Sequence, residues 1–301
     1  LKAAIEFGRN KLGTPILIGA EKRIKEQLIN IGLDENYKIQ IVNSTNKEKR
    51  ERYVKHLYKR LQREGQLERD VDRLVRNERI AWGASMIACK DADAMVTGNI
   101  RHYAASIEKL KKVTDPRPGE EIFGMTMITL KGKTILVADT NVQDFPSPER
   151  LVKVSKSCVR VARLFGFDPK VAFLSHSTFG KPISKNTKHV RDAIQLLKNE
   201  KVDFDFDGEM QPDVALNPIY QEIYPFSKIV GNANILIMPA LHSAAISTKL
   251  MKVFGGGKLI GPLLIGLGSP IEVAPLRAST SEILNLASIA AYSSDVIDYS
   301  S

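Results

Sequence analysis

Along the chain, stretches with an apolar residue every three or four positions alternate with short runs of consecutive apolar residues. The first pattern predicts amphipathic helices and the second predicts buried strands. The elements expected in the first third are helix 3–11, strand 15–19, helix 21–31, strand 37–42, a long polar helical stretch 47–76 with a break at Gly65, helix 80–89 and strand 94–97. Strands that alternate with helices of this length are typical of parallel βαβ units.

Residues 114–119 separate this part from a second one. Their sequence, Thr-Asp-Pro-Arg-Pro-Gly, has the composition of an exposed connection. Beyond it, the runs 123–130 and 134–138 flank Lys-Gly-Lys, which predicts an antiparallel hairpin. The elements expected after the hairpin are helix 148–164, strand 171–174, helix 185–197, strand 233–239 and helix 281–291. The chain is therefore expected to form an α/β fold of two lobes, each a largely parallel sheet with flanking helices, and the second sheet is expected to be mixed.

Composition narrows the class of protein. The chain has 301 residues, of which 43% are hydrophobic and 26% charged, so neither a disordered nor a fibrous class is indicated. No apolar run approaches the roughly 20 residues of a membrane span, and no signal peptide is recognisable. Cys89 and Cys158 form no disulfide framework and no zinc pattern. A cytoplasmic protein without a metal is expected, and the missing initiator Met suggests that the sequence is a piece of a longer one.

The formal net charge of +10 points to an anionic partner. Nucleic-acid binders usually add stacking aromatic residues, but aromatic residues make up only 7% of this chain, so no nucleic-acid partner is expected. The densest basic run, 47–63, also contains acids, which favours a solvated helix face. The alternative is a docking surface for an upstream domain or for a phosphate tail. A phosphate-bearing metabolite is the expected ligand class.

The run Ser-His-Ser-Thr-Phe-Gly-Lys at 175–181 directly follows a predicted strand. Ligands in open α/β sheets collect at the carboxyl ends of strands. The candidate phosphate-binding residues are Ser177, Thr178, Gly180 and Lys181. A helix beginning near Ser184 would add its N-terminal amides. The alternative is an ordinary polar loop with Ser184 as a helix N-cap.

Three other patterns are weaker indications of a functional site. The acidic segment 205–213 lacks the spacing of a calcium loop, so a structural or ligand-lining role is favoured over a metal site. Of the five scattered histidines, His176 and His242 each lie beside a strand end and are candidates for a ligand-facing role. The glycines of 255–268 lack the G-x-G-x-x-G order of a dinucleotide site.

Several of these segments together resemble the phosphate acetyltransferase family. Residues 93–98 (Asp-Ala-Met-Val-Thr-Gly) are similar to that family's strand and Ser-Gly turn, 174–180 to its phosphate loop, and 206–213 to its acidic signature. The segments 231–239 and 260–267 complete a match that keeps its order over nearly the whole chain.

The resemblance implies two α/β lobes with a coenzyme A cleft between them, a dimer, and a C-terminal helix that returns to the first lobe. The lobes are then expected at 1–118 with 264–301, and at 119–263. No cofactor is implied, and the coenzyme A ester is the ligand.

The chain departs from this family where the chemistry is done. The family's Ser-Arg-Gly active-site tripeptide falls on Pro275, Leu276 and Arg277, so its serine is replaced by a residue with no donor. The family's catalytic aspartate aligns with Glu282, and its first-lobe arginine with Glu108. Because each lost phosphate or oxyanion clamp costs about 2.7–4 kcal/mol, no intact catalytic set is expected, and Arg277 and Glu282 are vestigial candidates.

These departures resemble the domain that follows the catalytic part of large bacterial NADP-dependent malic enzymes, where the resemblance implies acetyl-CoA binding and inhibition of the attached enzyme. The first hypothesis is therefore a regulatory domain whose partners are acetyl-CoA or a related ester, an upstream malic enzyme catalytic domain, and further copies in a homodimer or higher oligomer. The ligand-binding residues expected are Ser177, Thr178, Gly180, Lys181, Thr97, His242, Arg277 and Ser279.

Two alternatives remain open. One is an active phosphate acetyltransferase, with Glu282 as base and Arg277 as clamp; the other is a purely structural oligomerisation module. Glu282 also has a simpler interpretation, since Ser-Thr-Ser-Glu at 279–282 is typical of a helix capping box.

Overall fold

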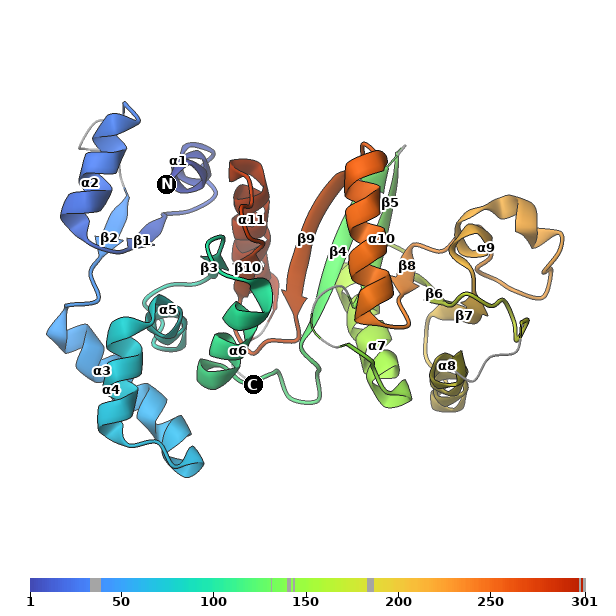
Figure 1. Cartoon of the computed structure of the whole chain (residues 1–301), viewed down its shortest axis with the longest axis horizontal. Helices are drawn as coiled ribbons and strands as arrows, with labels where there is room; N and C mark the ends of the chain where they lie inside the picture. Colours follow the sequence, from blue (N-terminus) through green and yellow to red (C-terminus); the bar gives the residue numbers. More distant parts are fainter. Residues whose placement is uncertain are drawn as a thin grey trace. The chain divides into compact units, whose positions relative to one another are not determined.

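A computed structural model describes residues 1–32, 39–130, 132–139, 142, 144–182, 187–297 and 299. The chain divides into two compact units. Unit 1 contains residues 1–118 and 267–301, and unit 2 contains residues 119–266 (Figure 1). Helices flank parallel strands in both, so the predicted α/β class is confirmed. Among the described residues, no helix is both long and apolar enough to cross a membrane.

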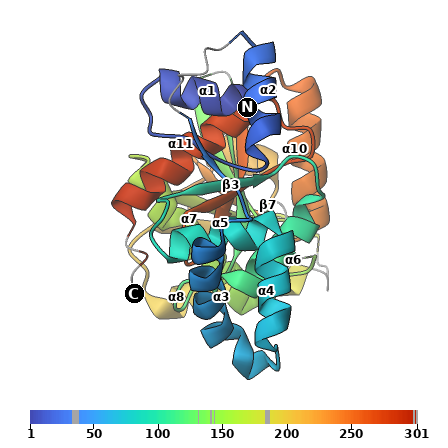
Figure 2. The same cartoon turned by 90° about the vertical axis from the view of Figure 1, so that its left-hand side faces the viewer.

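Unit 1 contains two separate pairs of parallel strands. Its strands are β1 (Ile16–Ile18) paired with β2 (Gln40–Val42), and β3 (Met95–Gly98) paired with β10 (Ile271–Ala274). Its helices are α1 (Lys2–Arg9), α2 (Glu21–Asn30), α3 (Lys47–Leu61), α4 (Glu68–Asn77), α5 (Arg79–Ala88), α6 (Tyr103–Val113) and α11 (Thr280–Val296), with a 3-10 turn η1 (Gln62–Glu64) after α3. Helix α11 packs on α1, β3 and β10 within this unit (Figure 2).

The helices α3, α4 and α5 form the core of one part of unit 1. The rings of Tyr53 and Trp82, both fully buried, meet edge to face with centroids 5.0 Å apart. The predicted break at Gly65 is confirmed, because this residue ends η1 with a φ of 79° in the left-handed region, where glycine is least strained. The stretch predicted as one helical region is therefore two helices that fold back on a shared core.

The basic residues of α3 are largely used in ion pairs inside unit 1. The described pairs include Arg50 with Asp72, Arg52 with Asp91, and Arg60 with Asp115. The hydrogen bonds that Arg60 donates lower the pKa of Asp115 below its usual value. The run predicted to be a solvated helix face is therefore a helix face whose charges are mostly paired within unit 1.

Unit 2 is built on one mixed six-stranded sheet with the strand order β7-β6-β8-β5-β4-β9. Its parallel strands are β7 (Asp205–Met210), β6 (Lys170–Leu174), β8 (Ile235–Ile237) and β5 (Lys133–Ala138); β4 (Phe123–Leu130) and β9 (Lys258–Ile265) continue it in antiparallel pairing. The predicted hairpin is confirmed, with Leu130 opposite Lys133. The predicted mixed sheet is also confirmed.

Helices cover both faces of this sheet. They are α7 (Pro148–Leu164), α8 (Lys188–Glu200), α9 (Pro212–Leu216) and α10 (Leu241–Phe254), with a 3-10 turn η3 (Pro218–Gln221). Residues of α9, α10 and the segment 229–233 share one apolar cluster with the strands. Helices α7 and α8 pack against each other on the opposite face (Figures 1 and 2).

Some expected elements differ from those observed. Helix α6, helix α10 and strands β9 and β10 were not predicted. Helix α8 begins at Lys188, three residues after the predicted start, and the expected N-cap Ser184 lies outside the described residues. The first residues of the expected strand 37–42 also lie outside them.

We predict that Leu57→Ala lowers the free energy of unfolding of unit 1 by about 2–5 kcal/mol, because it leaves a cavity among α3, α4 and α5. Leu57 is 1% exposed. The matched control is Leu67→Ala, where a leucine that is 50% exposed should cost less than about 0.5 kcal/mol. Denaturant titration of both variants measures the two losses, and equal losses would contradict this packing.

Candidate functional site

The loop that follows β6 surrounds a buried carboxylate. Glu209, on β7, is 1% exposed. Its Oε1 accepts hydrogen bonds from the Ser177 hydroxyl at 2.9 Å and the Gly180 N–H at 3.1 Å. The Arg191 guanidinium, from α8, donates to the same oxygen at 3.2 Å. The acidic segment thus takes the structural role favoured by the sequence, and it holds two of the residues expected to bind phosphate.

The other residues of this loop differ in how far their polar groups are exposed to solvent. The Thr178 Oγ1 accepts the Gln211 N–H at 3.2 Å, and the backbones of Thr178 and Lys181 bond each other at 2.8 and 3.1 Å. Gly180 has a φ of 85° and open space where a Cβ would lie. The side chain of Lys181 is exposed. Lys181 is therefore the loop residue whose charge faces solvent.

His176 and His242 are both exposed in the structure. His176 lies in the same loop, and its carbonyl accepts a hydrogen bond from the Gln211 amide at 2.9 Å. His242 lies in the first turn of α10. In the described part of the chain, no group of three or more His, Cys, Asp or Glu side chains could hold a metal ion.

A second group of expected residues gathers in unit 1, where β3 and β10 run parallel and end at the same edge. Thr97 lies opposite Val273 in the register of this pair. The Arg277 N–H donates to the Asn99 carbonyl at 2.9 Å, so the two strand ends are tied together. At Gly98 a Cβ would overlap the carbonyl oxygen of Ala274, so the close approach needs glycine.

Asn99 is a site residue that the sequence analysis missed. Within the described residues its Oδ1 is buried and accepts no hydrogen bond. Its φ of 68° turns the chain after β3. Asparagine tolerates this left-handed region better than most residues, which is the signal that could have marked it.

Glu282, which the sequence analysis matched to the family's aspartate, forms hydrogen bonds at the start of α11. The Ser279 N–H donates to Glu282 Oε2 at 2.7 Å, and the Glu282 N–H donates to Ser279 Oγ at 3.2 Å. This is the predicted capping box, and it is confirmed. Glu108 lies exposed on α6.

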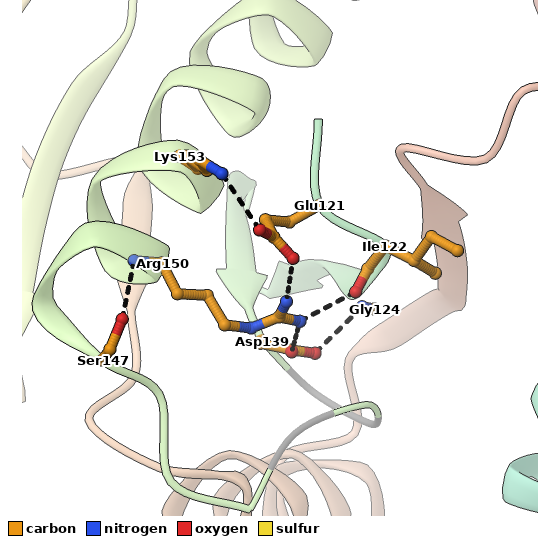
Figure 3. Close-up of polar contacts among 7 residues, drawn as sticks. All are labelled: Glu121, Ile122, Gly124, Asp139, Ser147, Arg150 and Lys153. Carbon is orange, nitrogen blue, oxygen red and sulfur yellow. Dashed lines mark hydrogen bonds and ion pairs between the residues drawn. The ribbon is translucent and has the colours of Figure 1, made fainter. Parts of the chain in front are cut away.

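A buried ion network in unit 2 also escaped the sequence analysis (Figure 3). Asp139 directly follows β5 and accepts the Gly124 N–H at 2.9 Å and the Arg150 guanidinium at 3.3 Å. Arg150, on α7, also binds Glu121 at 2.7 Å and the Ile122 carbonyl at 2.8 Å. The network fastens the end of β5 to the start of β4 and to α7. An aspartate placed directly after an apolar strand was its only sequence signal.

Comparisons with known proteins agree on one family. Residues 1–291 match the family described as Phosphate acetyl/butaryl transferase. The chain is 43% identical over 293 residues to the NADP-dependent malic enzyme of Rhizobium meliloti, covering 97% of this chain and 38% of that protein. The chain thus spans well under half the length of this relative.

Two solved structures have the same fold. The EutD phosphotransacetylase from Staphylococcus aureus aligns with a TM-score of 0.85 and 26% identity, covering 97% of this chain and 89% of that one. A phosphotransacetylase from Streptococcus pyogenes aligns with a TM-score of 0.89 and 25% identity, covering 98% and 90% of the two chains.

We expect Glu209→Ala to destabilise unit 2 more than Glu209→Gln. Alanine removes the oxygen that Ser177, Gly180 and Arg191 share as acceptor, which costs about 1–3 kcal/mol, whereas glutamine retains an oxygen at the same place. Urea unfolding of both variants measures the difference. Glu200→Gln, which removes an exposed partner of Lys156, is the control and should cost no more than about 1 kcal/mol. Equal losses for the two Glu209 variants would show that the three donors do not depend on this oxygen.

Proposed function

The chain belongs to the phosphate acetyl/butaryl transferase family, and from this premise we propose that it is a regulatory domain that binds acetyl-CoA and has lost efficient acyl transfer. It is a phosphotransacetylase-like domain of the kind found in malic enzymes. We further propose that its natural partner is an upstream NADP-dependent malic enzyme catalytic domain, which acetyl-CoA inhibits through this domain.

The loop between β10 and α11 is the observation that carries the proposal. Transfer requires a base that removes the thiol proton of coenzyme A and donors that stabilise the tetrahedral intermediate. Pro275 directly follows β10 and has no N–H or hydroxyl to donate. The Glu282 carboxylate accepts the Ser279 N–H, so taking up a thiol proton would weaken the capping box. Both chemical roles are therefore compromised in one loop.

Binding acetyl-CoA requires fewer groups than transferring its acyl group, and the chain contains residues suited to binding. Acetyl-CoA carries several phosphate charges, which favour cations and N–H donors. Each unit has an exposed cation in its candidate site: Arg277 follows β10 in unit 1, and Lys181 lies in the loop after β6 in unit 2. Thr97 and Asn99 lie at the strand edge to which Arg277 is tied. The net charge of +10 adds a general attraction for anions.

Inhibition of an attached enzyme follows from linkage. If acetyl-CoA binds one state of the full-length protein more tightly and the malic enzyme substrates bind another, each ligand shifts the population away from the state that the other prefers. Acetyl-CoA and the substrates then weaken each other's binding by the same factor. The NADP-dependent malic enzyme of Rhizobium meliloti is much longer than the part matched by this chain, which leaves room for such a catalytic part.

An active transferase is the second candidate function. It is favoured by the exposed Arg277 at the end of β10, one position from the place of the family's arginine. In that case Glu282 would leave the capping box and act as the base.

We predict that calorimetric titration detects acetyl-CoA binding and that Lys181→Ala weakens it about tenfold, the effect of losing roughly one charge-assisted hydrogen bond. Lys133→Ala, at an exposed lysine of the β4–β5 hairpin, is the matched control and should bind as the unchanged chain does. Unchanged affinity in Lys181→Ala would remove this loop from the site, and the absence of any binding would refute the proposed function.

We also expect no steady release of free thiol from acetyl-CoA when phosphate or arsenate is the acceptor. The triple variant Pro275→Ser, Leu276→Arg, Arg277→Gly should remain inactive, because Glu108 still places an anion where the family has an arginine. Thiol release by the unchanged chain would establish the transferase instead. Release by the triple variant alone would show that Glu108 is not inhibitory.

A further inference from the structure

Three neighbouring parallel strands of unit 2 send the chain to opposite faces of the sheet. In the strand order, β8 lies between β6 and β5. The chain leaves β5 and β6 for α7 and α8, which pack together on one face, and it leaves β8 for α10, which belongs to the other layer (Figure 1). In open α/β sheets, ligands bind outside the carboxyl ends of strands whose connections diverge in this way. The carboxyl ends of β5, β6 and β8 are therefore well placed for a ligand.

An exposed aromatic ring lies at this edge of the sheet. Phe145, in the connection from β5 to α7, is 64% exposed. Its ring meets that of His189, on α8, with centroids 4.8 Å apart and planes inclined by 42°. The His189 Nε2 lies 3.0 Å from the carbonyl oxygen of Pro239, in the connection after β8. Each of the three diverging connections thus contributes one residue to a single cluster.

Hydrogen bonds and a proline hold both rings of this cluster in place. The Asp144 carbonyl accepts the Leu241 N–H at 3.2 Å, which ties the chain before Phe145 to the first residue of α10. Pro146 is buried, and a proline confines the residue before it to extended conformations. Because a carbonyl oxygen can only accept, the Nε2 of His189 carries the hydrogen, and its bond holds the imidazole beside the phenyl ring.

A fixed and exposed aromatic ring is suited to stacking with another flat ring. Nucleic-acid bases stack on such side chains without a hydrogen bond to the protein, and a ring already held in place loses little conformational entropy on binding. Within acetyl-CoA only the adenine is a flat aromatic ring, since the acetyl and pantetheine parts are aliphatic chains with polar groups. Lys181, the exposed cation of the loop after β6, lies at the same strand edge, where it suits the phosphates attached to the adenosine.

We propose that Phe145 is the platform on which the adenine ring of the coenzyme A ester stacks. His189 is a positioning residue, because it acts on the ligand only through the ring of Phe145. This inference rests on the proposed function, to which it adds the place where the nucleotide end of the ligand binds. It involves residues of unit 2 alone and assigns no chemical step.

Calorimetric titration of the 301-residue chain should show that Phe145→Ala weakens acetyl-CoA binding about five- to 150-fold, the loss that accompanies removal of one stacked base. Adenosine 3′,5′-bisphosphate, the nucleotide end of coenzyme A, should lose affinity by the same factor. S-acetylpantetheine, which lacks the nucleotide, is the matched control ligand and should bind the variant and the unchanged chain equally. Because Phe145 is largely exposed, the urea midpoint of the variant should not change.

Two further variants distinguish stacking from a simple apolar contact. Phe145→Leu keeps an apolar side chain without a ring, so it should lose most of the affinity that Phe145→Ala loses, whereas Phe145→Trp should retain it. Stacking also moves the ring-proton resonances of adenine upfield in NMR spectra of the bound bisphosphate, and this shift should disappear in Phe145→Leu. A Phe145→Leu variant that binds as the unchanged chain does, or that produces the same shift, would overturn the proposal.

The same titrations separate this inference from the proposed function. Equal acetyl-CoA affinity in Phe145→Ala and the unchanged chain would refute the platform and leave the proposed function standing. Binding of the bisphosphate through Phe145 without any binding of acetyl-CoA would refute the proposed function, and it would overturn the assignment of the ring to coenzyme A in favour of a free adenine nucleotide. A chain that binds neither ligand would refute both.

Discussion

A carboxylate removed from water must be matched by donors, and among the described carboxylates of unit 2 Glu209 is the most deeply buried. Ser177, Gly180 and Arg191 meet it from the loop after β6 and from α8. One oxygen atom therefore links the strand β7, the loop and the helix. The loop that resembles a phosphate cradle already holds an internal anion, and this fixes which of its groups can face a ligand. The exposed Lys181 is the loop residue that the proposed function assigns to the ligand, while the Ser177 hydroxyl is bonded to Glu209.

In unit 1, the residues proposed to bind a ligand are distinct from those at the positions of the family's catalytic residues. Its strand edge keeps Thr97, Asn99 and Arg277 together, which suits the binding of a polar ligand. After that edge, Pro275 has no group to donate, and Glu282 is part of the capping box of α11. A family of transferases can give rise to a sensor in this way, because a site that binds a substrate needs only to lose its general base and its oxyanion donors. The chain keeps the fold of its family, and the proposed change of function lies in the loop between β10 and α11.

Sequence patterns predicted some elements of the fold and missed others. The hairpin of β4 and β5, helix α7 and the mixed sheet were predictable from apolar runs and a Lys-Gly-Lys turn. Helix α10 was missed because it has apolar residues on two sides, and β9 because Gly261 and Pro262 within it resemble a turn. The residues of the candidate site could be named from the sequence, but their contacts could not. Glu209 and Ser177 are 32 positions apart, and Asp139 and Arg150 belong to different elements, so only the folded sheet brings each pair together.

The close approach at Gly98 has a consequence for how mutational data on this chain should be interpreted. Any side chain at this position would collide with the backbone of β10, whatever its charge or polarity. A saturation scan would therefore find position 98 intolerant to every replacement, with a loss pattern like that of a catalytic residue. The cause would be the spacing of two strands, and unfolding measurements would reveal it where an activity screen could not. Intolerance to substitution is therefore informative about chemistry only at positions where a larger side chain would fit.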